Sequence, residues 1–254
     1  MLNEALLRVA VSGASGRMGR QVVDAVSTSS DLMVAACIDI GGDLGAALSE
    51  SKAQALVDFT TPTAVLGNIL TALDAGVVPV VGTTGLTAQG TEQVRLKCAQ
   101  TGIGVLIAPN FALGAVLMMR FASEAARYFP DAEIVEMHHE NKLDAPSGTA
   151  LLTAKRIADG RCGATPIAIP AAAHGLPGAR GAVGEGEIPI HSVRLPGFVA
   201  SQFVTFGGLG QTLTIRHDTL DRSSFMPGVL LALRRLEIIR QAADIVYGLE
   251  NLME

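Results

Sequence analysis

The sequence predicts an α/β protein in which an open parallel sheet covered by helices is followed by a second, more β-rich α+β part. Three observations support this expectation. Apolar runs alternate with helical segments over the first 111 residues, a glycine-rich turn joins the first run to the first helix, and the pattern changes from Gly114 onward. Continuous apolar runs are typical of parallel strands that are buried on both faces.

The first expected strand covers residues 6–11, and a turn with the spacing Gly-x-x-Gly-x-x-Gly leads from it into a helix. Glycines at this spacing permit a tight turn, a close approach of the backbone to a pyrophosphate and close packing of helix on strand. We therefore predict a dinucleotide-binding turn. Its residues are Gly13, Ala14, Ser15, Gly16, Arg17, Met18 and Gly19.

A second strand over residues 32–38 leads to Asp39, about twenty residues after the last glycine of the turn. An acid at this place hydrogen-bonds the ribose hydroxyls of the adenosine. Asp39 favours NADH, because a carboxylate repels a 2′-phosphate. Arg17 and Arg20 could accommodate that phosphate, so NADPH stays open as the alternative cofactor.

Three more strands are expected at residues 55–60, 77–81 and 103–107, with helices at 61–74 and 91–100. In an open parallel sheet, ligands bind beyond the carboxyl ends of the strands. The loops at those ends are therefore predicted to line the nicotinamide half of the cofactor. Their residues are Phe59, Gly82, Thr83, Thr84, Ala108, Pro109, Asn110 and Phe111.

The second part begins with a helix expected from residue 114 to about 128, a strand at 132–137 and a helix at 150–158. Antiparallel strands are then expected at 188–195, 198–206 and 212–217, with turns at 196–197 and 207–210. Residues 174–187 contain five glycines, which indicates a mobile or ligand-covering loop rather than a regular element. A last helix, 227–243, is expected to pack back on the first part.

The stretch from Glu136 to Ala150 concentrates the candidate chemistry of the second part. Pro146 interrupts regular structure there, and Ser147 or Thr149 can cap the following helix. The first N–H groups of that helix suit a carboxylate or a phosphate. Lys142 adds a positive charge, and His138 can exchange a proton near neutral pH. The stretch is therefore predicted to bind a small acid and to protonate it.

Simpler interpretations of this stretch remain open. His138 and His139 could be solvated surface residues, and Ser147 could be only a helix cap. A metal site is not expected, because no cysteine or third histidine lies at ligand spacing. Side chains alternate across a strand, so the two histidines can reach one ligand only if the strand ends or bends between them.

Composition restricts the class of protein. The net charge is −5 and there is no basic block, so no nucleic-acid partner is expected. Cys37, Cys98 and Cys162 are scattered, which favours a reducing cytoplasm over a disulfide framework. Mean hydropathy is +0.39. The uncharged run between residues 97 and 120 is interrupted by glycine, proline and asparagine, so neither a membrane span nor a secretory signal is expected.

Seven stretches, spread over nearly the whole chain, match the motifs of a known family. Six of them are residues 11–20, 58–60, 82–85, 108–111, 178–181 and 222–228. The seventh is Glu136-x-His138-His139-x-x-Lys142-x-Asp144-Ala145-Pro146-Ser147-Gly148-Thr149-Ala150, in which the part from His138 to Thr149 is the most specific. In these stretches the chain resembles the dihydrodipicolinate reductase family.

The resemblance implies a Rossmann-like, doubly wound dinucleotide-binding domain of residues 1–111 and 223–254. Residues 112–222 would form a substrate-binding and oligomerisation domain whose open mixed sheet builds a homotetramer. It also implies that the cyclic product of aspartate semialdehyde and pyruvate, a dicarboxylate, is reduced by NADH or NADPH in lysine and diaminopimelate synthesis.

Individual roles follow from the same resemblance. His138 would be the general acid, and Lys142 would join in proton donation or charge stabilisation. His139 would hold the substrate, and Gly148 and Thr149 would bind its carboxylate.

The chain departs from many relatives at Ala200-Ser201-Gln202 and at Gln211. These positions bear on the second sheet and the oligomer interface, and neither belongs to the catalytic set that the resemblance implies. Two other functions are considered. One is a different two-domain NAD-dependent dehydrogenase, and the other is a nucleotide-binding protein without catalysis. The first would lack the motif at 138–149, and the second would lack its acid or its lysine.

Overall fold

The chain forms two compact units, and the computed structural model describes residues 6–167, 176 and 178–253. The first unit comprises Met1–Ala112 and Phe225–Glu254, and the second comprises Leu113–Ser224. The C-terminal segment therefore returns to the unit that contains the glycine-rich turn.

The first unit is built on a six-stranded sheet in which every strand pair is parallel. The strand order is β11-β5-β4-β3-β1-β2. Valine, leucine and alanine fill the central strands and are almost completely buried, as a sheet covered on both faces requires. The strands are β1 (Leu7–Ser12), β2 (Leu32–Ile38), β3 (Ala55–Asp58), β4 (Val78–Val81), β5 (Val105–Ile107) and β11 (Ile245–Tyr247).

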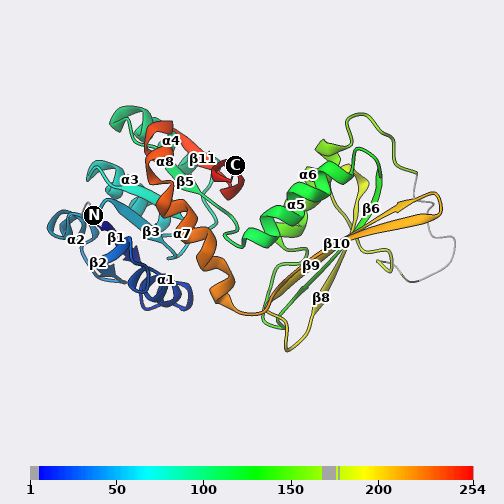
Figure 1. Ribbon diagram of the computed structural model, residues 1–254, viewed down its shortest axis with the longest axis horizontal. Coiled ribbons are helices and arrows are strands. Elements are labelled where there is room, and N and C mark those ends of the chain that lie inside the picture. The colour runs from blue at the N-terminus through cyan, green and yellow to red at the C-terminus, as the bar shows by residue number, and fades with distance from the viewer. Residues whose placement is uncertain (1–5, 168–175, 177, 254) are drawn as a thin grey trace. The chain divides into compact units, whose positions relative to one another are not determined.

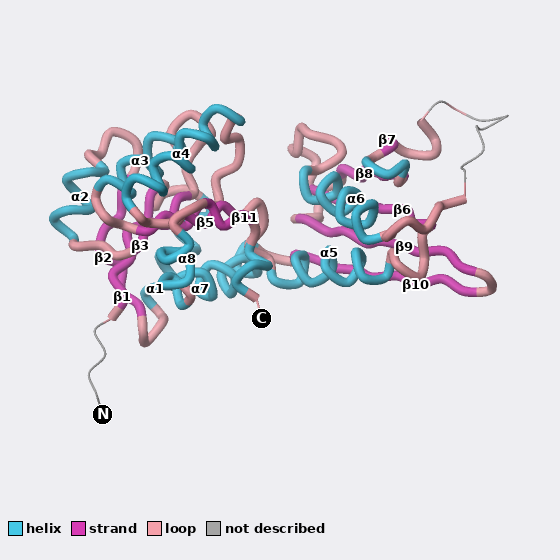
Figure 2. The backbone as a smooth tube through the Cα atoms, turned by 90° about the horizontal axis from the view of Figure 1, so that it is seen from above, coloured by secondary structure: helices cyan, strands magenta, loops and turns pink. Residues whose placement is uncertain are grey.

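Helices cover both faces of this sheet, so the unit is a Rossmann-like, doubly wound fold, as predicted. Figure 2 shows α2, α3 and α4 on one face and α1, α7 and α8 on the other. The helices are α1 (Arg17–Ser27), α2 (Leu44–Ser51), α3 (Val65–Asp74), α4 (Ala88–Thr101), α7 (Met226–Arg234) and α8 (Leu236–Ala242). Short 3₁₀ turns occur at Arg222–Phe225 and Leu249–Leu252.

The C-terminal segment differs from the single helix expected over residues 227–243. Arg235 has φ −103° and ψ 20°, which ends α7 and separates it from α8. The break lets α7 contact α1 while α8 contacts β5. The chain then adds β11 as the edge strand beside β5, an element that the sequence analysis did not anticipate.

The second unit has a five-stranded mixed sheet with the order β10-β9-β6-β8-β7. Among the described residues of this unit, β6 and β8 are the only parallel pair. Helices α5 and α6 lie side by side against one face of it (Figure 1). Its elements are α5 (Leu113–Ala125), β6 (Asp131–His138), α6 (Gly148–Gly160), β7 (Ala182–Val183), η1 (Glu185–Glu187), β8 (Pro189–Arg194), β9 (Ala200–Gly208) and β10 (Gln211–Thr219).

Alternation along the strands separates the two faces of this sheet. Ile134, Val204 and Phe206 face the helices and are fully buried with Ala154 and Ile157 of α6. Glu136 and His138 follow Ile134 at the same period of two, so they extend this face toward the end of β6.

Two expectations for the second unit need correction. Residues 196–197 do reverse the chain between β8 and β9, but these strands are not neighbours, because β6 lies between them. The glycine-rich segment is not wholly irregular, since residues 182–183 pair with β8 and residues 185–187 form a 3₁₀ turn. The other part of this expectation, residues 174, 175 and 177, lies outside the described residues.

Candidate functional site

The glycine-rich turn has the shape that a pyrophosphate site requires. Gly13 has φ +78°, and a Cβ there would lie 2.5 Å from the carbonyl oxygen of Phe59. A Cβ on Gly19 would lie 2.0 Å from the carbonyl oxygen of Gly13. Both positions therefore exclude side chains, and α1 starts directly behind the turn. Among the described residues no side chain caps its first N–H groups, which suit a phosphate.

Asp39 lies beside this turn, as the sequence analysis predicted. It directly follows the last residue of β2, and its carboxylate accepts a hydrogen bond from the Ser15 N–H, 3.1 Å from either oxygen. The N–H of Gly13 donates to the carbonyl of Ile38 at 2.8 Å, which ties the turn to the end of β2. Asp39 is exposed, so its carboxylate is accessible to a ribose.

The loops at the carboxyl ends of β4 and β5 border a pocket of about 340 Å³. Thr83, Thr84, Ala108 and Pro109 are among its lining residues, and Tyr247 of β11 joins them. Four of the predicted nicotinamide-site residues therefore share one pocket. Tyr247 was not predicted to line it, because its strand β11 was not predicted.

The remaining predicted residues of these loops pack beside one another. The rings of Phe59 and Phe111 lie 5.7 Å apart at 58°, and a Cβ on Gly82 would clash with the Phe59 ring. Asn110 accepts a hydrogen bond from the Ala112 N–H at 2.8 Å through its side-chain oxygen. These contacts fix the loop shapes.

A buried carboxylate supports the same edge of the sheet. Asp58 is fully buried at the end of β3 and accepts hydrogen bonds from the hydroxyls of Thr60 (2.8 Å) and Thr83 (2.6 Å) and from the Asn68 amide (2.7 Å). It therefore holds the loops after β3 and β4 together. Neither Asp58 nor Asn68 was assigned a role from the sequence, although Asp58 lies in the matching stretch 58–60.

In the second unit, β6 ends at His138, and the chain turns through residues 140–141 toward α6. The strand thus ends between the two histidines, which removes the alternation that would send them to opposite faces. The loop passes through a cis bond between Ala145 and Pro146. Ser147 caps α6, accepting a hydrogen bond from the Ala150 N–H at 3.2 Å, so Gly148 and Thr149 form the first turn of the helix.

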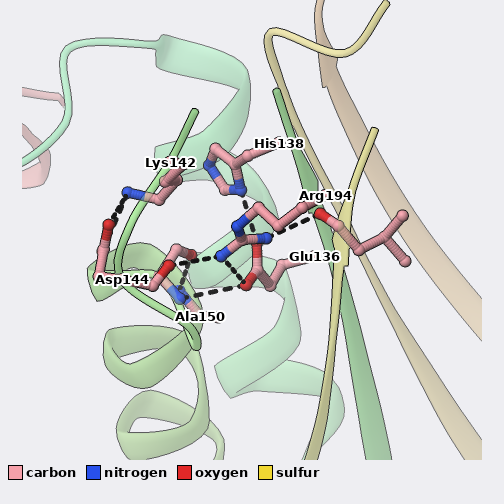
Figure 3. Close-up of polar contacts among 8 residues, drawn as sticks. Glu136, His138, Lys142, Asp144, Ala150 and Arg194 are labelled. Carbon is pink, nitrogen blue, oxygen red and sulfur yellow. Dashed lines mark hydrogen bonds and ion pairs between the residues drawn. The ribbon is translucent and has the colours of Figure 1, made fainter. Parts of the chain in front are cut away.

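Glu136 contacts His138, and Arg194 in turn holds Glu136 (Figure 3). Neither residue was assigned a role from the sequence. The Glu136 carboxylate is fully buried and lies 2.5 Å from His138 Nδ1. Arg194 donates to both of its oxygens, at 2.9 and 2.8 Å. Burial opposes ionisation of Glu136, but hydrogen bonds from His138, Arg194 and Ser192 outweigh it and lower the pKa of Glu136 to about 2.

Lys142 has a partner that the sequence analysis did not assign. Its ammonium group donates to both oxygens of Asp144, at 2.7 and 2.9 Å. This hydrogen bond lowers the pKa of Asp144. Figure 3 shows the pair beside the loop that leads into α6. The structure thus gathers a held histidine, a lysine and a helix N-terminus on one unit, which is chemistry suited to binding and protonating an acid.

Among the described residues, no group of three or more histidine, cysteine, aspartate or glutamate side chains is placed to hold a metal ion. Within the same residues, no helix combines the length and the apolar character needed to cross a bilayer.

Two family models together match nearly all of the chain. The model described as "Dihydrodipicolinate reductase, N-terminus" matches residues 7–111, and "Dihydrodipicolinate reductase, C-terminus" matches residues 114–253. The chain belongs to the dihydrodipicolinate reductase family. It is therefore an oxidoreductase of a family that depends on pyridine nucleotides, and the resemblance seen in its motifs is confirmed.

Similar proteins of the dihydrodipicolinate reductase family are named 4-hydroxy-tetrahydrodipicolinate reductase. One from Mycobacterium marinum (strain ATCC BAA-535 / M) is 51% identical over 248 residues, covering 97% of this chain and 99% of the relative. One from Desulfitobacterium hafniense (strain DSM 10664 / DCB-2) is 48% identical over 271 residues, covering 98% and 99%.

A solved structure of the same family is similar to this chain, and a more distant one shares its fold. Dihydrodipicolinate reductase from Paenisporosarcina sp. TG-14, bound to dipicolinate, has a TM-score of 0.86 and 40% identity, covering 98% of this chain and all of that one. A probable dehydrogenase from Thermotoga maritima has a TM-score of 0.64 at 9% identity, covering 97% and 92%. The fold is thus shared with other dehydrogenases, and it is the family match that separates this chain from them.

Proposed function

We propose that this chain reduces 4-hydroxy-tetrahydrodipicolinate to tetrahydrodipicolinate in lysine and diaminopimelate synthesis. The observation that carries the proposal is the buried Glu136–His138 pair beside Lys142 and the start of α6, in a member of this family. Residues 1–111 and 223–254 would bind the nucleotide, and residues 112–222 would bind the substrate.

The cofactor is proposed to be NADH in preference to NADPH. The exclusion of side chains at Gly13 and Gly19 suits a pyrophosphate, and the accessible Asp39 carboxylate suits a free ribose 2′-hydroxyl. When bound, the nicotinamide supplies the hydride. Thr83, Thr84, Ala108 and Pro109 would orient its ring from the pocket walls, while Phe59, Gly82, Asn110 and Phe111 fix the loops.

The substrate is a dicarboxylate, so its site must offset two negative charges. The N–H groups of Gly148 and Thr149 at the start of α6 would bind one carboxylate, assisted by the Thr149 hydroxyl and by His139. Lys142 would stabilise the charge of the bound substrate or join in proton donation. The dipicolinate in the Paenisporosarcina structure is a dicarboxylate of this class.

His138 would provide the proton. Reduction of the conjugated imine leaves an enamine-like carbon that must be protonated, and an imidazolium near neutral pH suits that step. His138 is held by Glu136 but keeps 14% of its side chain exposed, so it is supported on one side and accessible on the other.

Assembly and location complete the proposal. The strand face opposite α5 and α6 carries the partly exposed apolar side chains of Val135, Val193 and Phe203, which supports a homotetramer built through this sheet. A cytoplasmic location is supported by three cysteines that are all unpaired.

A coupled absorbance assay tests the reaction. Dihydrodipicolinate synthase, pyruvate and aspartate semialdehyde generate the substrate, and the oxidation of NADH and NADPH is followed separately after this protein is added. Rapid oxidation that depends on the synthase is expected, and faster with NADH. Absence of oxidation with either cofactor, while NADH still binds in a titration, would overturn the proposal.

A further inference from the structure

The buried carboxylate of Glu136 contacts His138, Arg194 and the N-cap residue of α6. Oxygen Oε2 accepts from His138 Nδ1 at 2.5 Å and from Arg194 Nη1 at 2.9 Å. Oxygen Oε1 accepts from Arg194 Nη2 at 2.8 Å and from the N–H of Ser147 at 3.2 Å. Since Ser147 is the N-cap of α6, one side chain contacts both the histidine and the start of the helix.

We propose that Glu136 is a positioning residue that, held by Arg194, selects the Nδ1–H tautomer of His138 and anchors the N-terminus of α6. The expected effect of Glu136 on kcat rests on the proposed function. The tautomer of His138 and the anchoring of α6 can be tested without any turnover. The inference assigns roles to Glu136, which contacts His138 and the N-cap of α6, and to Arg194, which holds the Glu136 carboxylate.

The contact between Glu136 and His138 Nδ1 is a hydrogen bond that one of the two side chains must donate. An ionised carboxylate only accepts hydrogen bonds. The donors that surround Glu136 keep it ionised at neutral pH, as its low pKa of about 2 reflects. The proton of the pair therefore resides on Nδ1 of His138, which leaves Nε2 as the nitrogen that faces a reactant.

Proton donation by His138 would produce the same Nδ1–H tautomer. An imidazolium carries a proton on both nitrogens, and Glu136 accepts the one on Nδ1. When the Nε2–H bond breaks, its electron pair stays on Nε2, the enamine electron pair of the substrate forms the new C–H bond, and His138 becomes neutral. The neutral form left behind is the Nδ1–H tautomer, which is the one that the carboxylate stabilises.

Arg194 links the Glu136 carboxylate to the loop before α6. Arg194 Nη2 donates to the carbonyl of Asp144 at 2.6 Å as well as to Glu136. The loop before α6 is thus held at Asp144 and at Ser147 by the same ion pair. A shift of Glu136 would move both the proton donor and the helix N-terminus, so the two parts of the site share one support.

The strand offers a matched control on its other face. Glu133 of β6 also contacts a histidine and an arginine, with His191 Nε2 at 3.0 Å and Arg180 Nη2 at 2.8 Å. Its side chain is 43% exposed, whereas that of Glu136 is fully buried. Glu133→Gln therefore removes the same charge from the same strand without touching His138.

The test uses the full-length protein labelled with ¹⁵N-histidine, which gives five histidines to resolve. His138→Gln assigns the His138 signals. At a pH where the imidazole of the wild-type protein is neutral, His138 is expected to show a protonated Nδ1 and an unprotonated Nε2. Glu136→Gln should change this tautomer ratio and reduce kcat by about 10–100-fold, with NADH affinity unchanged. Glu133→Gln should leave both the His138 signals and kcat unchanged.

The wild-type spectrum decides the matter even if Glu136→Gln does not fold, because a dominant Nε2–H form would overturn the proposal. A folded Glu136→Gln protein with the wild-type tautomer ratio would overturn it too, whatever its kcat. If the Nδ1–H form is found but the coupled assay shows no turnover, the positioning role stands and the proposed function fails.

Discussion

Both carboxylate oxygens of Asp39 lie 3.1 Å from the backbone nitrogen of Ser15, so the acid at the end of β2 is in contact with the glycine-rich turn. This contact fixes a negative charge where the adenosine ribose would bind. The same charge would oppose a 2′-phosphate at short range.

Asp39→Ala should therefore weaken NADH more than NADPH. Loss of a ribose hydrogen bond is expected to raise the Kd of NADH about tenfold, while NADPH loses less because a repulsion is removed too. Fluorescence titration with both cofactors measures this. Asp43→Ala is the control, since Asp43 caps α2 through the Ala46 N–H at 3.0 Å. Equal weakening of both cofactors would contradict the ribose assignment.

His138→Gln should reduce kcat by about 10²–10⁴-fold, the usual contribution of a general acid, with the Kd of NADH unchanged. Steady-state kinetics in the coupled assay and a separate cofactor titration check the two parts. His191→Gln is a suitable control, because His191 lies on β8 and contacts Glu133. Full activity of the His138 variant would remove this residue from the acid role.

Lys142→Ala should lower kcat/KM by about 10–100-fold, because a charge-assisted contact with a dicarboxylate is lost. The variant also leaves Asp144 without its 2.7 Å ion pair, which adds a repulsive charge near the substrate. Lys155→Ala provides the comparison, since Lys155 forms exposed ion pairs with Asp159 and Glu185. If the two lysine variants behave alike, Lys142 has no special role toward the substrate.

Much of the first unit could be predicted from its sequence because its signals are local. The glycine spacing, Asp39 and the apolar runs each report on a few neighbouring residues, and the structure places them as expected. By contrast, β11 is a three-residue strand whose identity depends on pairing with β5, which comes about 140 residues earlier. Nothing in Ile245-Val246-Tyr247 alone indicates that pairing.

The residues that hold His138 in place also show that contacts between distant parts of the chain are hard to predict from sequence. Glu136 could have been predicted, since residues two apart on a strand share a face. Arg194 could not, because it reaches Glu136 only through the parallel pairing of β6 with β8, in which His138 lies opposite Arg194. The sequence indicates adjacent antiparallel strands in this region, and the insertion of β6 between β8 and β9 depends on the tertiary fold.

Gly19→Ala should destabilise the first unit by about 1–3 kcal/mol and weaken NADH binding, because the new methyl group would lie 2.0 Å from the Gly13 carbonyl oxygen. Thermal unfolding and cofactor titration measure the two effects. Gly67→Ala is the matched control: Gly67 lies within α3 and a Cβ there meets nothing within 4 Å, so it should stabilise the protein by about 0.5–1 kcal/mol. Similar unfolding temperatures for both variants would contradict the packing argument.

Acid should destabilise the protein partly through Glu136. Its folded-state pKa of about 2 lies below the ordinary value of 4.5, so its contribution to stability is present above pH 4.5 and is lost as the pH falls toward 2. Between pH 5 and pH 3 this loss amounts to about 2 kcal/mol.

Urea unfolding at several pH values should therefore show that the free energy of unfolding falls less steeply with acid for Glu136→Gln than for the wild type. Glu133→Gln, whose carboxylate is half-exposed, is the control and should keep most of the wild-type slope. Parallel slopes for the wild type and Glu136→Gln would mean that the carboxylate is not held ionised by His138 and Arg194.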